Sequence, residues 1–427
     1  MDKILIKGGT PLKGTIAISG SKNAALPIMA ASLLTPETLI LSNIPLLADI
    51  TTMSNLLTNH GVSLTVDGVS SFTSNNGRVL QLNAANVNNY TAPYDIVRKM
   101  RASVWVLGPL LARFGQACVS LPGGCAIGNR PIDLHISALE KLGASIELKD
   151  GYITAYTKSR LKGTDIHFDK VSVGATANIM MAATLADGLT VITNVAKEPE
   201  ICNLAECLKA MGAIIEGVGT DTITIEGIRE LHGTHHTIIP DRIEAGTYAI
   251  ASAITDGEIN LININPELIE NIIQKLRLTG VDISINDNGI LVKRAAKYIN
   301  STDINTQPYP GFPTDMQAQF MALMSIASGS SVIAENIFEN RFMHASELIR
   351  MGADITINGS AAVVKGIEKL KGAPVMATDL RASVSLVLAA LAAEGDTYIN
   401  RVYHIDRGYE RIEEKLIACG ANIKRSK

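Results

Sequence analysis

The segment SLPGGCAIGNRPIDLH, residues 120–135, combines a thiol, an arginine and several glycines. Glycines on both sides of Cys125 predict a loop whose backbone approaches another group closely. Two interpretations of this cysteine stay open at this point. A free cysteine is usually a small buried hydrophobe, whereas a thiol in a cationic loop gains thiolate character and reactivity.

Charged and polar residues also mark the edges of stretches that are otherwise apolar. Those at the start of predicted buried helices are Lys22, Asn23, Arg101, Ser172, Glu244, Asp315 and Arg381, and those just before predicted outer helices are Arg130, Arg341 and Arg407. Helix N-termini attract anions, and arginine pairs bidentately with phosphate or carboxylate. Each arginine taken alone would be expected to form an ordinary salt bridge. Because cations recur at matching positions of the repeat, however, they predict a cleft for a multiply anionic ligand.

Two acidic residues have an ambiguous place at helix starts. Asp315 in FPTDMQAQF and Asp379 in MATDLRAS suit a helix cap, and either could instead be a general base for a hydroxyl. Ser21 in ISGSKNAALP is a candidate N-cap ahead of Lys22. The stretch lacks the Gly-x4-Gly-Lys pattern of a nucleotide-binding P-loop.

Histidines and cysteines form no metal-binding pattern. His135, His344 and His404 lie near the polar edges, and we interpret each as a hydrogen-bonding residue. The cysteines at 118, 125, 202, 207 and 419 lack framework spacing, so reduced thiols of a cytoplasmic protein are expected. The pattern therefore predicts no metal and no disulfide.

Composition narrows the class of protein further. The chain has 427 residues, 47% of them hydrophobic, which is enough for two or three domains with sizeable cores. A net charge of −3 predicts no nucleic-acid partner. No run reaches the 18 or so apolar residues of a membrane span, and the start lacks a secretory apolar region, so no membrane partner is expected.

The predicted helices and strands that would position these charged and polar residues recur along the chain. A phrase of the type MGAIIE recurs, with its glycine at Gly61, Gly143, Gly212, Gly280, Gly352 and Gly420. Each phrase follows an amphipathic helical stretch and opens a strand, so the glycine is predicted to end the helix in the left-handed conformation. Upstream of each phrase lies a small-residue apolar stretch such as GATANIMMAATLADG, which predicts a buried helix.

The repeat unit therefore reads as buried helix, strand, outer helix, glycine and strands. Six units predict an α/β protein of two domains, each built from three repeats. We expect residues 22–239 to form an N-terminal domain that carries the cysteine loop. Residues 1–21 and 240–427 would form a C-terminal domain, which the leading strand region completes.

These motifs together resemble the enolpyruvyl transferases that act on UDP-N-acetylglucosamine, in their Cys-loop form. The resemblance rests on GSKNAALP, SLPGGCAIGNRPIDLHISALEKLGA, DKVSVGAT, PDRIEAGT, FPTDMQAQF, FENRFMH, MATDLRAS and YHIDRGYERIEEKL, in this order from residue 1 to about 425. It implies two inside-out α/β domains of three units each, joined by a double-stranded hinge. It also implies that the cleft closes over the sugar nucleotide.

The resemblance implies an activity and a set of site residues. The enolpyruvyl group of phosphoenolpyruvate would pass to the 3-hydroxyl of UDP-N-acetylglucosamine, with no metal or organic cofactor, in the first committed step of peptidoglycan precursor synthesis. Cys125 would donate the proton, Asp315 would act as base, and Lys22, Asn23, Arg130 and Arg407 would hold phosphoenolpyruvate. Arg341 and Arg381 would face the enolpyruvyl group, and the UDP-sugar residues would be Arg101, Arg130, Pro131, Ile132, Asp133, Leu134, Lys170, Val171, Ser172, Val173, Asp315 and Ile337.

Two alternatives stay open beside this interpretation. One is a non-catalytic sensor of UDP-sugars or anions, which would need neither Cys125 nor Asp315. The other is a shikimate-type transferase. For the enzyme we expect a cytoplasmic monomer or weak homo-oligomer whose Cys125 is alkylated by the epoxide phosphonate fosfomycin.

Overall fold

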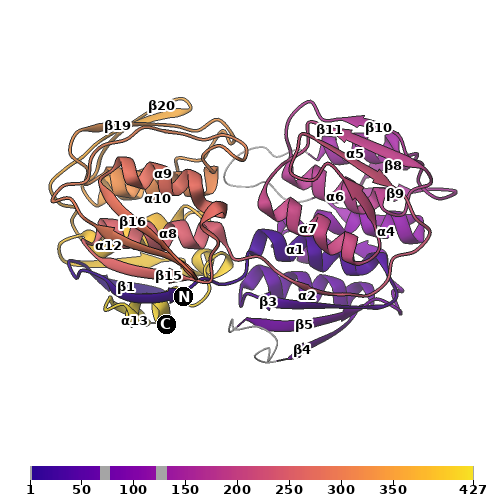
Figure 1. Ribbon diagram of the computed structural model, residues 1–427, viewed down its shortest axis with the longest axis horizontal. Coiled ribbons are helices and arrows are strands. Elements are labelled where there is room, and N and C mark those ends of the chain that lie inside the picture. The colour runs from indigo at the N-terminus through magenta and orange to yellow at the C-terminus, as the bar shows by residue number, and fades with distance from the viewer. Residues whose placement is uncertain (1, 68–76, 122–131, 427) are drawn as a thin grey trace. The chain divides into compact units, whose positions relative to one another are not determined.

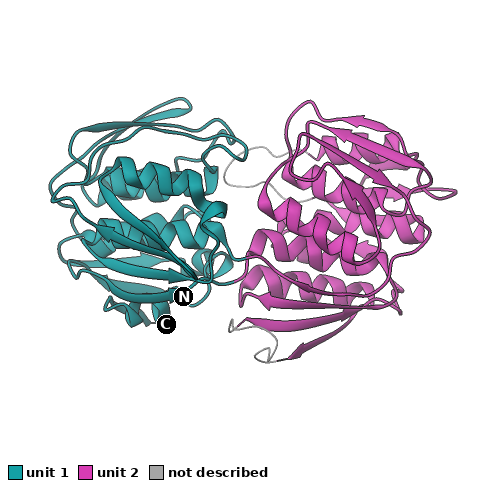
Figure 2. Cartoon of the chain, in the orientation of Figure 1, with its two compact units in different colours: residues 1–19, 125–129, 240–427 teal, residues 20–124, 130–239 magenta. Residues whose placement is uncertain are grey.

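The structure is a computed structural model that describes residues 2–67, 77–121 and 132–426. These residues fall into two compact units (Figure 2). Unit 1 takes residues 2–19 and 240–426, and unit 2 takes residues 20–67, 77–121 and 132–239.

The described helices follow the predicted alternation of buried and outer helices. The buried ones are α1 (Lys22–Ala31), α4 (Leu107–Phe114) and α6 (Val173–Ala183) in unit 2, and α8 (Arg242–Ile254), α10 (Gln317–Met324) and α12 (Ser383–Ala392) in unit 1. The outer ones are α2 (Ala48–His60), α5 (Asp133–Lys141), α7 (Pro199–Ala210), α9 (Glu270–Leu278), α11 (Ala345–Arg350) and α13 (Ile412–Ala418). Short helical turns are η1 (Ser32–Leu34), α3 (Tyr94–Val97), η2 (Arg101–Val106), η3 (Pro266–Ile269), η4 (Thr314–Met316) and η5 (Val402–Arg407).

Unit 2 contains three four-stranded sheets of one topology. In each, the first strand pairs in parallel with the second, and the remaining pairs are antiparallel. Their orders are β14 (His235–Thr237), β3 (Thr38–Ile44), β5 (Arg78–Asn83), β4 (Ser63–Asp67); β6 (Thr91–Ala92), β7 (Gln116–Ser120), β9 (Tyr152–Tyr156), β8 (Ser145–Lys149); and β10 (Asp165–His167), β11 (Leu189–Thr193), β13 (Thr222–Glu226), β12 (Ile214–Glu216).

Unit 1 repeats this topology, with the start of the chain built into two of its sheets. The orders, again from the parallel pair, are β2 (Lys13–Ala17), β15 (Glu258–Ile262), β17 (Gly289–Arg294), β16 (Val281–Asn286); β18 (Ile304–Asn305), β19 (Ser330–Ala334), β21 (Ala361–Lys365), β20 (Asp354–Asn358); and β22 (Pro374–Met376), β23 (Asp396–Asn400), β1 (Lys3–Lys7), β24 (Asn422–Ser426). Strand β1 pairs antiparallel with both β23 and β24, so that Leu5 lies opposite Tyr398 and Lys424. Strands β1 and β2 from the start of the chain thus belong to sheets whose other strands come from residues 258–426.

The glycines of the repeated phrase end the outer helices as predicted. Gly61, Gly143, Gly212, Gly280, Gly352 and Gly420 have φ values of 100°, 95°, 104°, 84°, 96° and 95°. This left-handed backbone is costly for residues with a Cβ atom. The phrase is therefore a structural signal of the repeat.

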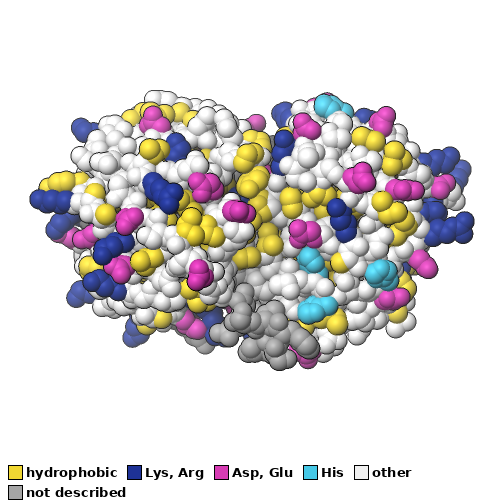
Figure 3. All heavy atoms as spheres, viewed as in Figure 1, with side chains coloured by type: hydrophobic (Ala, Val, Ile, Leu, Met, Phe, Trp, Pro, Cys, Tyr) yellow, Lys and Arg dark blue, Asp and Glu magenta, His cyan; other side chains and the backbone are white. Residues whose placement is uncertain are grey.

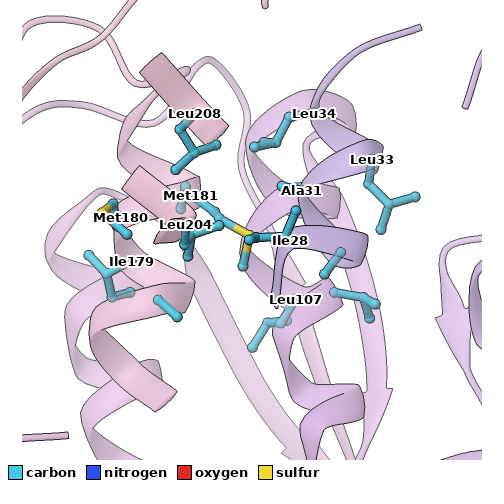
Figure 4. Close-up of a cluster of buried hydrophobic side chains, with 14 of the residues drawn as sticks. Ile28, Ala31, Leu33, Leu34, Leu107, Ile179, Met180, Met181, Leu204 and Leu208 are labelled. Atoms are coloured by element: carbon cyan, nitrogen blue, oxygen red, sulfur yellow. The ribbon is translucent and has the colours of Figure 1, made fainter. Parts of the chain in front are cut away.

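Helices form the middle of each unit, and the sheets lie around them (Figure 1). The side chains buried between these elements form one apolar cluster in each unit. In unit 2, side chains from α1, α4, α6 and α7 meet in one buried cluster that includes Ile28, Leu107, Met181 and Leu204 (Figure 4). The many alanines of α1 and α6 let these helices approach closely. Polar residues at helix ends are thereby held on a densely packed scaffold.

Among the described residues, two segments connect the units, and they hydrogen-bond to each other on both sides of the boundary. The amide of Ser21 donates to the carbonyl of Ile239 at 2.7 Å, and the amide of Asp241 donates to the carbonyl of Ser19 at 2.8 Å.

Among the described helices, none combines the length and apolar character needed to cross a membrane. Acidic and basic side chains are interspersed on the face of each unit drawn in Figure 3.

Candidate active-site residues

In unit 2, the first turn of α1 holds a buried ion pair. The Ser21 hydroxyl accepts a hydrogen bond from the amide of Ala24 at 3.4 Å, which confirms it as the N-cap. The Lys22 Nζ atom lies 3.2 Å from Oδ2 of Asp49, and both side chains are only 5% exposed. Asp49 lies in the first turn of α2 and neutralises the ammonium group. Asn23 follows on α1 and is half-buried.

The residues predicted to bind the UDP-sugar in unit 2 lie on three segments. Arg101 opens η2, residues 132–134 form the start of α5, and residues 170–173 lead into α6. The indole Nε1 of Trp105 donates to the carbonyl of Gly174 at 3.1 Å, which ties η2 to α6. Side chains of α5 also pack on α6. These three segments are therefore brought together, whereas Cys125, Arg130 and Pro131 lie outside the described residues.

In unit 1, Asp315 lies between two arginines. Its Oδ1 accepts from Nη2 of Arg341 at 2.6 Å, and its Oδ2 lies 3.5 Å from Nε of Arg381. The carboxylate is 24% exposed, while the arginine side chains are 4% and 3% exposed. No capping hydrogen bond from a side chain forms at η4. The capping interpretation of Asp315 is therefore wrong, because its carboxylate is bound by Arg341 of the same repeat and by Arg381 of the next repeat.

Asp379 differs from Asp315 although their motifs are similar. Its carboxylate accepts hydrogen bonds from the amides of Arg381 at 3.0 Å and Ala382 at 2.9 Å. The capping interpretation is confirmed for this residue. Asp379 thus fixes the backbone that carries Arg381.

The guanidinium of Arg381 is held from several sides. Its Nη2 lies 3.2 Å from Oδ2 of Asp241, the N-cap of α8, and its Nη1 donates to the carbonyl of Gly408 at 3.2 Å. The ring of Tyr409 lies 5.6 Å away. Burial opposes the charge of Arg381, but the surrounding acidic groups outweigh burial and raise its pKa. Arg407, the neighbour of Gly408, ends η5 and is half-buried.

A chain of hydrogen bonds connects Asp315 to Ile337. Nη1 of Arg341 donates to Oγ1 of Thr314 at 2.8 Å, and the Thr314 hydroxyl donates to Oε2 of Glu335 at 2.8 Å. The other carboxylate oxygen of Glu335 accepts from the amides of Ile337 at 2.9 Å and Phe338 at 3.1 Å. A predicted UDP-sugar residue and the predicted base therefore belong to one network.

Sequence reasoning missed several members of these networks. Asp49, Asp241, Thr314 and Glu335 were not singled out. Asp241 carried a usable signal, because it follows a proline at the start of a buried helix, close to the arrangement around Asp315. Glu335 carried none, since its partners come from separate segments.

The histidines near these sites behave differently from one another. His135 hydrogen-bonds Asn178, which confirms its predicted role. The prediction is wrong for His344, because neither ring nitrogen of this fully buried residue has a partner among the described residues. Burial lowers the pKa of His344 to about 4. Within residues 2–67, 77–121 and 132–426, no cluster of His, Cys, Asp or Glu is suited to hold a metal ion.

The whole chain is similar to known transferases of the enolpyruvyl group. The family model described as EPSP synthase (3-phosphoshikimate 1-carboxyvinyltransferase) matches residues 6–416. The enolpyruvyl transferase NikO from Streptomyces tendae has a TM-score of 0.88 at 23% identity, over 100% of this chain and 99% of that one. EPSP synthase from Acinetobacter baumannii has a TM-score of 0.77 at 18% identity, over 100% of both chains. At these identities the solved structures establish the fold alone.

The chain belongs to the enolpyruvyl (1-carboxyvinyl) transferase family, as its motifs predict. Within it, a protein from Paramagnetospirillum magneticum is 62% identical over 100% of this chain and 99% of its own length. One from Rhodospirillum centenum is 59% identical over the same shares. Both relatives are named UDP-N-acetylglucosamine 1-carboxyvinyltransferase. The predicted fold class and the predicted resemblance are confirmed.

Proposed function

We propose that this enzyme transfers the enolpyruvyl group of phosphoenolpyruvate to the 3-hydroxyl of UDP-N-acetylglucosamine and releases phosphate. The observation that carries the proposal is 62% identity over the full chain to a relative named for this reaction. The EPSP synthase structures share the fold at only 18% identity. The product would enter peptidoglycan precursor synthesis, so we infer a role in cell-wall growth and division. Both substrates are charged metabolites, and we assign the reaction to the cytoplasm.

The proposed reaction is an addition followed by an elimination. The 3-hydroxyl oxygen attacks C2 of phosphoenolpyruvate while C3 accepts a proton, and the hydroxyl proton passes to a base. The tetrahedral intermediate then loses phosphate from C2 and a proton from C3, which restores the double bond. The scheme needs an acid near C3, a base near the hydroxyl, and cations for the phosphate and carboxylate.

Asp315 is the proposed base, and its surroundings link its action to substrate binding. Arg341 and Arg381 contact its two carboxylate oxygens. An anionic substrate competes with Asp315 for these guanidinium groups. We infer that phosphoenolpyruvate draws an arginine toward itself, and that the carboxylate oxygen thus released accepts the hydroxyl proton.

The other residues are assigned by their chemistry and by their match to the family motifs. Cys125 is the proposed acid toward C3. Lys22, Asn23, Arg130 and Arg407 are the proposed phosphoenolpyruvate ligands, and the buried pair of Lys22 with Asp49 supports this because it holds an ammonium group ready at a helix start. The proposed UDP-sugar residues are Arg101, Arg130, Pro131, Ile132, Asp133, Leu134, Lys170, Val171, Ser172, Val173, Asp315 and Ile337.

Phosphate release with purified enzyme tests the proposal. We expect phosphoenolpyruvate and UDP-N-acetylglucosamine together to release phosphate, with no release when either is omitted. Release with shikimate 3-phosphate in place of the UDP-sugar would indicate the shikimate-type reaction instead. Binding of UDP-N-acetylglucosamine without release under either condition would support the sensor alternative and refute the enzyme assignment.

A further inference from the structure

A buried polar network in unit 2 joins η2, α4, α5 and α6, and the proposed reaction assigns it no role. Its centre is Asn178, a fully buried residue in the middle of α6. This helix is otherwise almost entirely apolar, with buried neighbours such as Ile179 and Met180. An amide in such a place is costly unless its polar atoms are paired.

Backbone groups determine how the Asn178 amide is oriented. Its Oδ1 accepts from the amide of Gly108 at 2.8 Å, and its Nδ2 donates to the carbonyl of Val104 at 3.3 Å. A backbone N–H can only donate and a backbone carbonyl can only accept, so the opposite orientation would lose both bonds. The atom that faces His135 is consequently the NH₂ group.

This orientation in turn determines the state of His135. Nδ2 of Asn178 lies 3.0 Å from Nδ1 of His135, so Nδ1 accepts and the ring proton is on Nε2. Burial, reinforced by the charge of Arg101, lowers the pKa of His135 to about 3. The ring is therefore a neutral acceptor at every pH at which the enzyme is expected to work.

Close packing holds the same ring against the start of α6. A Cβ atom added to Gly174 would lie 3.2 Å from Nε2 of His135 and 3.9 Å from Nε1 of Trp105. A Cβ atom added to Gly108 would lie 2.4 Å from Oδ1 of Asn178. Gly108 thus allows an approach of Asn178 that a side chain would displace, and a Cβ atom at position 174 would require the His135 ring to shift slightly.

The network touches each segment that carries proposed UDP-sugar residues in unit 2. Val104 and Trp105 follow Arg101 on η2, and His135 directly follows Leu134 on α5. Gly174 directly follows Val173 on α6. One amide and one imidazole therefore connect three segments that must bind one ligand.

We propose that His135 and Asn178 are positioning residues for the UDP half of the sugar nucleotide, acting through the segments they join rather than by touching the substrate. The inference rests on the proposed function, because it assumes that these segments bind UDP-N-acetylglucosamine. It assigns these two residues no role in binding phosphoenolpyruvate. A change at either residue should therefore affect binding of the UDP-sugar and leave binding of phosphoenolpyruvate unchanged.

The test compares His135→Leu with His135→Asn. Leucine removes the acceptor, whereas the Oδ1 of asparagine can replace Nδ1 as acceptor toward Asn178. For His135→Leu we expect the KM for UDP-N-acetylglucosamine and the Kd for UDP, measured by calorimetry, to rise about tenfold, as loss of a buried hydrogen bond implies. The KM for phosphoenolpyruvate should stay within about twofold, and His135→Asn should restore most of the UDP affinity. His232→Leu, at an exposed histidine of the same unit, is the matched control.

Each other outcome contradicts the inference. Equal increases in both KM values, or an unchanged Kd for UDP in the folded leucine variant, would exclude a positioning role for the nucleotide. If both variants lose UDP affinity together with thermal stability, the residue is structural and the proposal is wrong. If the wild type releases phosphate and the leucine variant has unchanged KM and Kd values, this inference alone is refuted. If the wild type releases no phosphate with UDP-N-acetylglucosamine, the proposed function is refuted as well.

Discussion

Each unit carries a buried polar network among its helices, and the two networks differ in charge. In unit 1, Asp241, Arg381, Asp315 and Arg341 form a ladder of charges at the starts of α8, α10 and α12. In unit 2, Asn178 and His135 form a neutral network beside the starts of α4, α5 and α6. Two units of the same repeated architecture thus hold a charged network in one case and a neutral network in the other, and the side chains determine which.

The difference lies in how the networks respond to a ligand. Charged groups in a buried ladder are stable only while each has a partner, and an anionic substrate can replace one partner with another. Neutral hydrogen bonds offer no such exchange, and burial keeps the His135 ring neutral. We therefore expect the charged network of unit 1 to change its contacts during the reaction and the network of His135 and Asn178 in unit 2 to hold its geometry.

The largest expected effect is on Asp315 in the charged network. Asp315→Asn keeps the size of the side chain but removes the base, so kcat should fall by about 10² to 10⁴ fold. Steady-state phosphate release measures it, with thermal melting as a check on folding. A loss of less than tenfold in a folded variant would show that another group takes the hydroxyl proton.

A second large effect is expected at Cys125, which lies outside the described residues. Cys125→Ala should lower kcat by about 10² fold or more, because it removes the proposed acid. Cys125→Asp should retain turnover and resist fosfomycin. Intact-mass analysis of the wild type with UDP-N-acetylglucosamine present should show one fosfomycin adduct. An adduct on a different cysteine, or a sensitive aspartate variant, would contradict the assignment.

Asp241 tests whether the charged ladder depends on every member. Asp241→Asn leaves the fully buried Arg381 without its nearest anionic partner, and breaking such a pair typically costs about 3–5 kcal/mol. The free energy of unfolding from urea titration should fall by a similar amount. Asp2→Asn, at an exposed carboxylate of the same unit, serves as the control and should change little. Equal stability of the Asp241 variant and wild type would show that Asp315 and Gly408 are sufficient partners.

The smallest effect expected is the pH dependence of stability in the neutral network. The pKa of His135 is about 3 in the folded protein and near 6.5 when unfolded, so the unfolded chain binds the extra proton between these values. The contribution of His135 to stability is therefore complete above pH 6.5 and decreases as pH falls toward 3, by up to about 1.4 kcal/mol per pH unit. Urea titrations between pH 5 and 8 measure this, and His135→Asn should flatten the curve. An unchanged slope in the variant would show that His344 or other buried histidines dominate.

Local patterns predicted much of the fold and part of the candidate sites. The repeated glycines and the apolar stretches predicted where outer helices end and which helices are buried, because backbone conformation and burial are encoded within a few residues. The Ser21 cap was predictable for the same reason. The ion pairs of Asp315 were not predictable, since its motif resembles that of Asp379 and only arginines distant in the sequence distinguish the two residues.

The sequence by itself therefore determined the sixfold repeat, the buried helices and the family to which their motifs belong. The tertiary structure alone decided which side chains act together: Arg381 with Asp241 and Asp315, and His135 with Asn178. The physical reason is the range of the interactions. Helix caps and left-handed glycines depend on neighbours along the chain, whereas buried charges and amides are stabilised by partners that only folding brings within hydrogen-bonding distance.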